Sequence, residues 1–302
     1  MLFITMLVAG VCHGSAPMID VHVHSDARYF STLSQILATN GITRFVNLSG
    51  GTPNKGLAES LEAAARIEGR AAVCVNIRWR HIASPDFAKR QVRSLERARA
   101  MGARCLKISK ALGLYVPSPE DPKRLLRVDD RRLDPIWAAA GRLGLPIFIH
   151  TGDPKAFFEP MGPNNERHAE LSRHPDWSFA GPQFPRREAL LAARDRVISR
   201  HPSTTFIAVH FANNPEDLDY VDRFLSKYPN AFVDIAARLP EIGRHPAARV
   251  RAVFNRHQDR ILFGTDLGYH GNSIMLGSVG NERPLLIDIF VFYAIHRRWF
   301  EG

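Results

Sequence analysis

The stretch Met18-Ile19-Asp20-Val21-His22-Val23-His24 decides how we interpret the fold of this chain. Apolar residues lead into it and then alternate with polar ones, and this alternation predicts a β-strand. Successive strand side chains point to opposite faces, so His22 and His24 project from the same face. Two imidazoles held in this way can share one divalent ion, although an H-x-H tripeptide alone is more often two ordinary strand histidines.

Strand and helix patterns alternate eight times along the 302 residues. The strands are expected at residues 18–24, 42–48, 71–79, 103–109, 145–150, 204–210, 231–236 and 260–266. The helices are expected at residues 30–40, 55–68, 85–101, 129–143, 188–200, 215–227, 246–257 and 285–299. This order predicts a (β/α)8 TIM barrel in the α/β class, a fold of about 250 residues, rather than an open doubly wound sheet. We expect residues 17–302 to form this single domain.

A long segment, residues 151–186, separates the fifth strand from the next helix and is rich in Pro, Gly and aromatic residues. Loops of this length inside a compact domain are usually functional. We expect Phe157, Phe158 and Trp177 either to wall the pocket or to form an inert cover over the barrel. At the other end of the chain, residues 285–299 either close the barrel or belong to a truncated C-terminal region.

The composition is that of an ordinary globular protein, with a formal charge of +10 carried by scattered basic residues. The sequence has no basic tail and no basic stripe interleaved with aromatic residues, so nucleic acid is not an expected partner. An anionic small-molecule substrate is a better use of the excess charge than nucleic acid, although a solvated arginine-rich surface explains it better than either. No run approaches the roughly twenty apolar residues of a membrane span. The oligomeric state stays open, a homo-oligomer included.

The sequence contains three cysteines, at positions 12, 74 and 105. Without a C-x-x-C motif, neither a cysteine-rich zinc site nor a redox pair is expected. Cys74 and Cys105 fall in neighbouring predicted strands, and we expect them to be buried as small hydrophobic side chains.

Residues 1–16 have some features of a signal peptide. Leu2 to Val11 is apolar, and Gly14-Ser15-Ala16 resembles a cleavage site. The segment has no basic residue before its apolar part, and cleavage would leave Pro17 at the new N-terminus. We expect export, with a cytoplasmic location as the alternative.

The carboxyl ends of the strands in such a barrel converge on one mouth, where the chemistry takes place. Several predicted strands end there in a polar side chain: His22 and His24 on the first, Lys107 on the fourth, His150 on the fifth, His210 on the sixth and Asp266 on the eighth. Any one of them alone is an ordinary strand-end residue, but the whole set at one rim favours a functional site. Three histidines and a carboxylate suit a divalent transition metal, zinc first, with Mn²⁺ or Fe²⁺ as alternatives.

These motifs resemble the amidohydrolase superfamily. The resemblance rests on Asp20-Val21-His22-Val23-His24, His150-Thr151-Gly152-Asp153-Pro154, Val209-His210 and Gly264-Thr265-Asp266, and it extends from about residue 18 to residue 270. It is strongest to the amidohydrolase-related branch of metal-dependent TIM-barrel hydrolases, which includes aminocarboxymuconate-semialdehyde decarboxylase. The resemblance implies that His22, His24, His150 and Asp266 bind the metal. It also implies that His210 is a general acid/base or a further ligand.

Chemistry suggests roles for two of these residues. A bound dication lowers the pKa of its water to about 7, which produces hydroxide at neutral pH. Asp266 could take a proton from that water and pass it to a leaving group. His210 could polarise a carbonyl or protonate a carbanion, and its alternative role is that of a structural histidine behind the ligands.

Lys107 decides the number of metal ions. In binuclear members of the superfamily that the chain resembles, a lysine ending the fourth strand becomes a carbamate that bridges two ions. We expect one metal, with Lys107 contacting the substrate, and keep two metals on a carbamylated Lys107 as the alternative. Arg78 and Trp79, at the end of the third strand, could clamp a substrate carboxylate, although surface packing explains them equally well.

We therefore expect a metal-dependent hydrolase that acts on an amide, ester or lactone bond of a small anionic substrate. The alternative is a non-oxidative metal-dependent decarboxylase of an aromatic or muconate-type acid. A non-catalytic metal- or ligand-binding barrel is a third class, and the substrate itself cannot be identified from fold and metal alone.

Overall fold

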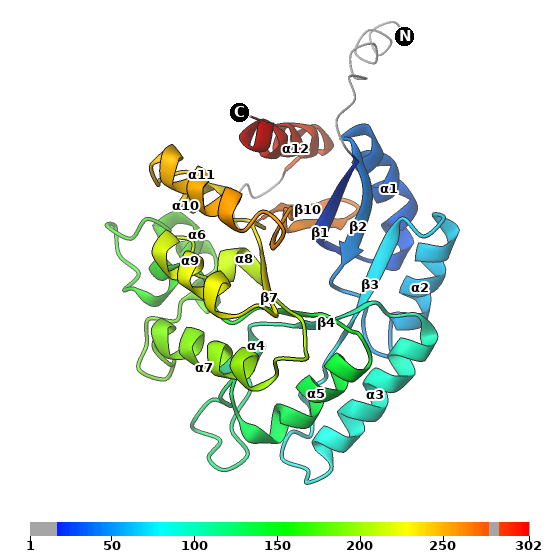
Figure 1. Ribbon diagram of the computed structural model, residues 1–302, viewed down its shortest axis with the longest axis vertical. Helices are drawn as coiled ribbons and strands as arrows, with labels where there is room; N and C mark the ends of the chain where they lie inside the picture. Colours follow the sequence, from blue (N-terminus) through cyan, green and yellow to red (C-terminus); the bar gives the residue numbers. More distant parts are fainter. Residues whose placement is uncertain (1–16, 278–283, 302) are drawn as a thin grey trace, which may run out of the picture.

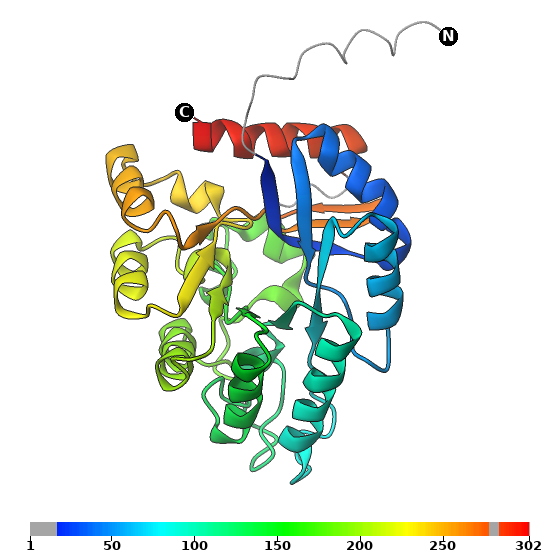
Figure 2. The ribbon, with the colours of Figure 1, turned by 45° about the vertical axis from the view of Figure 1, so that its right-hand side comes forward.

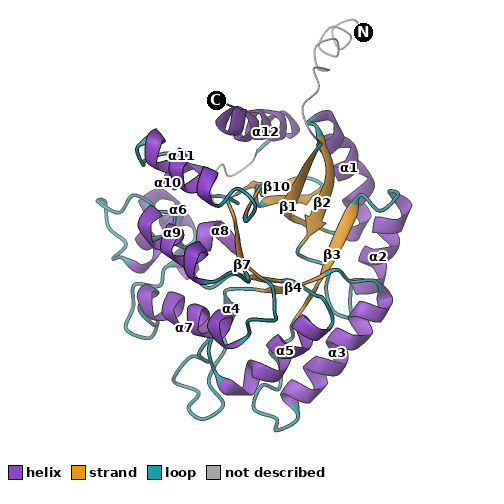
Figure 3. Cartoon of the chain, in the orientation of Figure 1, coloured by secondary structure: helices purple, strands orange, loops and turns teal. Residues whose placement is uncertain are grey.

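A computed structural model of the chain describes residues 17–277 and 284–301. Eight parallel strands form a curled sheet inside a ring of helices (Figures 1 and 3). They are β1 (Met18–Ser25), β2 (Ile42–Asn47), β3 (Ala71–Asn76), β4 (Cys105–Ile108), β5 (Ile147–Ile149), β6 (Phe206–Ala208), β7 (Ala231–Asp234) and β8 (Ile261–Leu262). Each strand pairs in parallel with the next, so the predicted (β/α)8 TIM barrel is confirmed. The expected signal peptide, residues 1–16, lies outside the described residues.

The helices that follow the strands lie close to their predicted positions. They are α1 (Phe30–Thr39), α2 (Leu57–Arg66), α3 (Phe87–Met101), α4 (Ala111–Leu114), α5 (Asp134–Arg142), α6 (His168–Arg173), α7 (Arg187–Arg200), α8 (Val209–Ala212), α9 (Leu218–Lys227), α10 (Leu239–Ile242), α11 (Ala247–Arg256) and α12 (Leu286–Glu301). Short helices α4, α8 and α10 follow β4, β6 and β7 directly, and α6 lies in the long segment after β5. These insertions stand at the carboxyl ends of the strands, where barrel enzymes carry their sites.

The barrel closes where the chain after β8 runs beside β1. The expected strand at 260–266 is shorter than predicted, because pairing with β7 involves only Ile261 and Leu262. Beyond it, the amide of Val21 donates to the carbonyl of Phe263 (3.0 Å) and the amide of Asp266 donates to the carbonyl of His22 (2.9 Å). The chain then continues as β9 (Leu267–His270), parallel to the end of β1, and turns back as β10 (Ser273–Leu276). This path brings Asp266 beside the two histidines of β1.

Buried apolar side chains form two clusters that match the alternation along each strand. The larger cluster lies between the strands and the surrounding helices, and it includes Leu106, Ile147 and Phe206. The smaller cluster consists of the alternate residues, which face the barrel interior: Leu48, Cys74, Cys105, Phe148, Ile207 and Val209. Lys107 follows Cys105 by two residues and therefore projects from the same face, one layer nearer the mouth.

Cys74 and Cys105 are buried as expected, but their pairing was not predicted from the sequence. The two residues are register partners on β3 and β4, and a disulfide joins them. The pairing depends on the register of two strands whose cysteines lie 31 residues apart in sequence, which no local motif reveals. The bridge joins two adjacent strands on the interior face of the barrel, two residues before Lys107 on β4.

Helix α12 lies across the end of the barrel where β1 begins (Figure 2). The hydroxyl of Tyr293 donates to Oδ2 of Asp20 (2.6 Å), and the hydroxyl of Thr265 donates to the same oxygen (2.6 Å). The other oxygen of Asp20 accepts the backbone amides of His22 and Thr265 (3.0 and 3.2 Å). Burial raises the pKa of Asp20 to about 6, against the hydrogen bonds from Thr265, Tyr293 and His22. One buried carboxyl group therefore ties α12 to the strand segments that precede His22 and Asp266.

Of the helices in residues 17–277 and 284–301, none combines the length and apolarity that a membrane span requires.

Replacing Tyr293 with Phe should lower the free energy of unfolding by about 1–3 kcal/mol, because buried Asp20 loses a hydrogen-bond donor while the ring is retained. Chemical denaturation followed by circular dichroism measures the change. Tyr115→Phe is the matched control, since the hydroxyl of Tyr115 is exposed and donates to the carbonyl of Asp176, and its effect should stay within about 0.5 kcal/mol. Equal stability of the two variants would contradict the tie between α12 and β1.

Candidate metal centre

Three of the predicted metal ligands meet at one point of the mouth. Oδ1 of Asp266 lies 3.3 Å from Nε2 of His22 and 3.4 Å from Nε2 of His24. His22 is fully buried, and its Nε2 atom has no hydrogen-bond partner in the described part of the chain. A buried nitrogen that no protein group satisfies is costly, and a metal ion would satisfy it. His22, His24 and Asp266 form one of two groups of ligand atoms within 4.8 Å of one another that could hold a metal ion.

The backbone places Asp266 there by an unusual conformation. Its φ of 65° lies in the left-handed region, which aspartate adopts more readily than most residues. The amide of Asp266 donates to the carbonyl of His22, so the two residues are held side by side. Gly264 lies two residues before Asp266. A Cβ atom at that position would lie 3.0 Å from Cβ of His22, so the close packing of this segment on β1 favours glycine.

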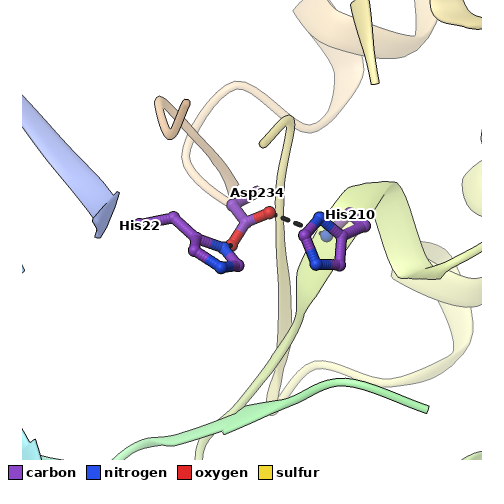
Figure 4. A group of neighbouring side chains, drawn as sticks. All are labelled: His22, His210 and Asp234. Carbon is purple, nitrogen blue, oxygen red and sulfur yellow. Dashed lines mark hydrogen bonds and ion pairs between the residues drawn. The ribbon is translucent and has the colours of Figure 1, made fainter. Parts of the chain in front are cut away.

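Asp234, the last residue of β7, orients His22 (Figure 4). Its Oδ2 atom accepts the Nδ1 proton of His22 (2.8 Å), which leaves the lone pair on Nε2. Its Oδ1 atom accepts the backbone amides of His210 (2.7 Å) and Ala236 (3.2 Å). The second ligand-like group contains His22, His210 and Asp234. Because both carboxylate oxygens already accept hydrogen bonds, we interpret Asp234 as the residue that positions the histidines.

His24 is oriented in a similar way. Its Nδ1 atom lies 2.6 Å from the hydroxyl oxygen of Ser49, in the loop after β2. With the Nδ1 proton donated to Ser49, the lone pair of Nε2 faces Asp266. The ring centroids of His22 and His24 are 5.4 Å apart, as expected for residues on one face of a strand.

His210 enters the mouth through a left-handed turn. His210, Phe211, Ala212 and Asn213 have φ values of 56°, 55°, 57° and 51°, and α8 is therefore not a regular right-handed helix. This conformation costs about 1–2 kcal/mol per residue for L-amino acids. Nδ1 of His210 lies 2.9 Å from the carbonyl oxygen of Ala236, which can only accept, so Nδ1 carries the proton and Nε2 the lone pair.

His150 lies beside His210 but belongs to neither group of ligand atoms. The two ring centroids are 4.4 Å apart. Nε2 of His150 donates to the carbonyl of Gly152 (3.1 Å), so only Nδ1 retains a lone pair for a metal. The same Nε2 lies 3.3 Å from Oδ1 of Asp153, whose other oxygen contacts the ammonium group of Lys110 at 2.5 Å.

The electrostatics of the mouth favour neutral imidazoles beside one ionised carboxylate. Burial lowers the pKa of His24 and of His210, and lowers that of His150 to about 4. Burial alone would raise the pKa of Asp266, but the neighbouring imidazoles of His22 and His24 and the charge of Lys107 hold it well below its usual range. Neutral imidazole and ionised carboxylate are the forms that bind metals.

Lys107 is buried in the mouth, with 6% of its surface exposed, and its Nζ atom has no hydrogen-bond partner among residues 17–277 and 284–301. Burial lowers its pKa to about 8, against the attraction of Asp234 and Asp266. At neutral pH most molecules therefore carry a buried ammonium group that faces two carboxylates without contacting either.

The other predicted contact residues lie farther from this centre. Arg78 is exposed, and Trp79 stacks against Phe87 of α3 (ring centroids 6.2 Å apart). In the described residues no hydrogen bond or ion pair joins Arg78 or Trp79 to the histidines, and their role as substrate contacts stays a prediction. Phe157 belongs to the core, whereas Phe158 packs against Phe179 (ring centroids 5.3 Å apart).

The long segment after β5 is fixed to the barrel rim. Arg167 pairs with Glu170 of α6 and with Glu241 of α10, and both glutamates are buried. The ammonium group of Lys110 lies 5.7 Å from the ring centroid of Trp177 and 5.3 Å from that of Phe179. The aromatic residues of this segment thus stand above the Lys110–Asp153–His150 chain.

Asp234, Ser49 and Asp153 were not among the site residues predicted from the sequence. A signal for Asp234 was present, because Phe232-Val233-Asp234 is an apolar strand ending in a polar residue, like the other strands of the site. The predicted strand ran on to residue 236, which placed the aspartate inside the strand. Asp153 appeared only as part of the motif His150-Thr151-Gly152-Asp153-Pro154, with no role of its own. Ser49 lies in a loop just after a strand, and no local pattern distinguishes it from other loop residues.

The structure is a TIM barrel whose mouth carries histidine and aspartate side chains that could hold a metal ion. The model of the amidohydrolase family matches residues 19–276, which is most of the chain. The chain belongs to the amidohydrolase family. No curated protein matches it in sequence.

Solved structures with low sequence identity share the fold. 2,6-Dihydroxybenzoate decarboxylase from Rhizobium is 14% identical, with a TM-score of 0.52 over 83% of this chain and 88% of that one. A zinc-bound amidohydrolase from Burkholderia multivorans is 13% identical, with a TM-score of 0.51 over 94% and 92% of the two chains. Dihydroxybenzoic acid decarboxylase from a Polaromonas species, with bound manganese and 2-nitroresorcinol, is 12% identical, with a TM-score of 0.50 over 83% and 86%.

Asp234→Asn should weaken metal binding by about 10- to 100-fold, because the amide no longer fixes the Nδ1 proton of His22 as a carboxylate does. Competition with a chromophoric chelator measures the affinity. Asp222→Asn is the matched control. Asp222 of α9 accepts a hydrogen bond from Nε2 of His257 rather than from a histidine of the mouth, so the variant should leave metal affinity unchanged. Unaltered affinity in Asp234→Asn would show that His22 needs no such partner.

Proposed function

We propose that this protein is a metal-dependent hydrolase that cleaves an amide, ester or lactone bond of a small anionic substrate. One observation carries the proposal: Asp266 is held between the Nε2 atoms of His22 and His24, and the Nδ1 atoms of both imidazoles already have partners. This arrangement leaves nitrogen lone pairs and an ionised oxygen directed at one point.

The residues fit a single divalent ion, zinc first. His22 and His24 would bind through Nε2, His150 through Nδ1, and Asp266 through its carboxylate. Three nitrogens and one oxygen are a common donor set for zinc, and manganese or iron would also accept it. A dication in this site would supply the nucleophile by lowering the pKa of a water molecule to about 7.

Two side chains would move protons. Asp266 is ionised at neutral pH, so it can accept a proton from the attacking water and pass it to the leaving group. His210 is neutral and has its lone pair on Nε2, because Nδ1 donates to the carbonyl of Ala236. During the reaction it would accept a proton at Nε2 and hold it there.

Lys107 would select an anionic substrate. Its buried ammonium group lacks a hydrogen-bond partner among the described residues, and a substrate carboxylate would supply one. This use of Lys107 favours one metal ion, because a carbamate that bridges two ions would remove the positive charge. Arg78 and Trp79 would serve the substrate only at the outer edge of the mouth, since neither contacts the histidines in this structure.

Decarboxylation is the second candidate. The similarity in fold to two dihydroxybenzoate decarboxylases supports it. The ammonium group of Lys107 would anchor the carboxylate of an aromatic acid. In that reaction the carbon that loses CO₂ gains a proton, which His210 would first take up from water at Nε2 and then deliver to the carbon. The metal ligands would be the same in both reactions.

We also infer that the protein is exported and that residues 1–16 act as its signal peptide. The disulfide between Cys74 and Cys105 supports this, because such bridges persist mainly in oxidising compartments.

Turnover in ¹⁸O-labelled water tests the function. Zinc-loaded protein is incubated with panels of anionic amides, esters and lactones and of hydroxybenzoic acids. We expect ¹⁸O in a carboxylate product, and Asp266→Asn should reduce the rate by about 10²- to 10⁴-fold while retaining one metal ion. The surface variant Asp219→Asn, which affects an exposed pair with Arg249, should keep full activity. Release of CO₂ without ¹⁸O in the organic product would establish the decarboxylase instead, and full turnover by Asp266→Asn would remove its proposed role.

A further inference from the structure

The left-handed turn from His210 to Asn213 needs support from outside its own sequence. Three of its four residues are neither glycine, asparagine nor aspartate, and such residues adopt positive φ values only when their surroundings enforce them. Within the turn, the amide of Asn213 donates to the carbonyls of Val209 and His210, and the amide of Asn214 donates to the carbonyl of Phe211. The carbonyls of Ala212 and Asn213 follow these in the chain.

Two arginines of α7 bind those carbonyls. Nη1 of Arg194 donates to the carbonyl of Ala212 (2.5 Å), and Nη2 of Arg187 donates to the carbonyl of Asn213 (2.8 Å). The arginines are seven residues apart, so they lie on the same face of the helix. That face also carries Leu190 and Val197 and packs against the barrel. Arg194 is fully buried and Arg187 is 7% exposed, where barrel helices usually present aliphatic side chains.

The buried charges of both arginines are balanced. Arg187 pairs with Glu216 (2.7 Å), and Arg194 pairs with Asp195 (2.8 Å) and binds the hydroxyl of Tyr220 (2.7 Å). A guanidinium group has five donors in a fixed plane, so it can serve an acid and a carbonyl at the same time. Each arginine therefore brings its own counter-charge and still has donors for the turn.

Arg187 also reaches the loop after β5. Its Nε atom donates to the carbonyl of Asp153 (3.1 Å), three residues after His150. The side chain of Asn213 completes the link, because its oxygen accepts the amide of Thr151 (3.1 Å) and its nitrogen donates to the carbonyl of Gly152 (2.6 Å). The loops that carry His150 and His210 are thus one hydrogen-bonded unit on α7.

We propose that Arg187 and Arg194 are positioning residues that set the two imidazoles of this unit: Arg194 acts on His210 alone, and Arg187 acts on both His210 and His150. The chemical use of these rings rests on the proposed function, but their placement does not. A lysine at either position retains the charge and loses the planar fork, so it should free the turn without removing the ion pair.

Histidine side-chain ¹H–¹⁵N spectra of the full chain loaded with Zn²⁺ test the placement without any turnover. In Arg194→Lys the His210 ring should lose its single Nδ1-protonated state and show an averaged signal, whereas His22, His24 and His150 keep theirs. In Arg187→Lys the signals of both His210 and His150 should change. Arg196→Lys is the matched control on the same helix, because Arg196 is exposed and pairs with Asp129, and its spectrum should equal that of the unmodified protein. Unchanged His210 signals in both inner variants would overturn the proposal.

A second variant covers the case in which Arg194→Lys fails to fold. Ala212→Gly should rescue it, because glycine adopts positive φ without steric cost and the turn then needs less support. We expect the double variant Arg194→Lys/Ala212→Gly to recover a cooperative thermal transition while its His210 signal stays averaged. A double variant no more stable than Arg194→Lys alone would overturn the proposal, and loss of hydrolase activity by itself would bear only on the proposed function.

Discussion

The carboxylate of Asp234 is the contact on which the rest of the site depends. One oxygen accepts the Nδ1 proton of His22 and the other accepts the backbone amide of His210, so a single buried side chain at the end of β7 fixes both His22 of β1 and His210, which follows β6. β1 is far from β6 and β7 in sequence and comes near them only because the ring closes. The ring closes through the hydrogen bond from the amide of Asp266 to the carbonyl of His22. The carboxyl group of Asp20 joins the same two segments, because it accepts the amides of His22 and Thr265. Geometry at the mouth is therefore a consequence of how the last strand segment joins the first.

The barrel accommodates more buried polarity near its mouth than a purely structural barrel needs. Lys107 stands above a disulfide and apolar neighbours with its charge facing two carboxylates, and four consecutive residues after β6 adopt left-handed conformations. Each of these features reduces stability in isolation. Their concentration around the histidines, together with balanced arginine pairs on α7, is typical of a site whose polar groups are arranged for chemistry rather than for stability.

Much of the fold could be predicted from sequence because each strand is short, apolar and followed by a helix with regular spacing. The same property revealed His22, His24, His150, His210 and Asp266, since each follows an apolar run. Other features depend on tertiary contacts. Cys74 and Cys105 pair because β3 and β4 have a particular register, and the left-handed turn after Val209 contains no glycine to indicate it. Arg187 and Arg194 look like solvated charges in the sequence, because a helical pattern does not reveal that a neighbouring turn has carbonyls to satisfy. Asp234 could have been predicted as a site residue if the expected strand had ended at residue 234 instead of residue 236.

Anomalous diffraction at the zinc edge, from crystals of the zinc-loaded protein, tests the central claim most directly. We predict one ion at about 2.0–2.2 Å from Nε2 of His22, Nε2 of His24, Nδ1 of His150 and the carboxylate of Asp266, with Nδ1 of His22 still bound to Asp234. An ion bound to Asp234 or to Nδ1 of His22, a second ion beside a modified Lys107, or no ion at these residues would contradict it.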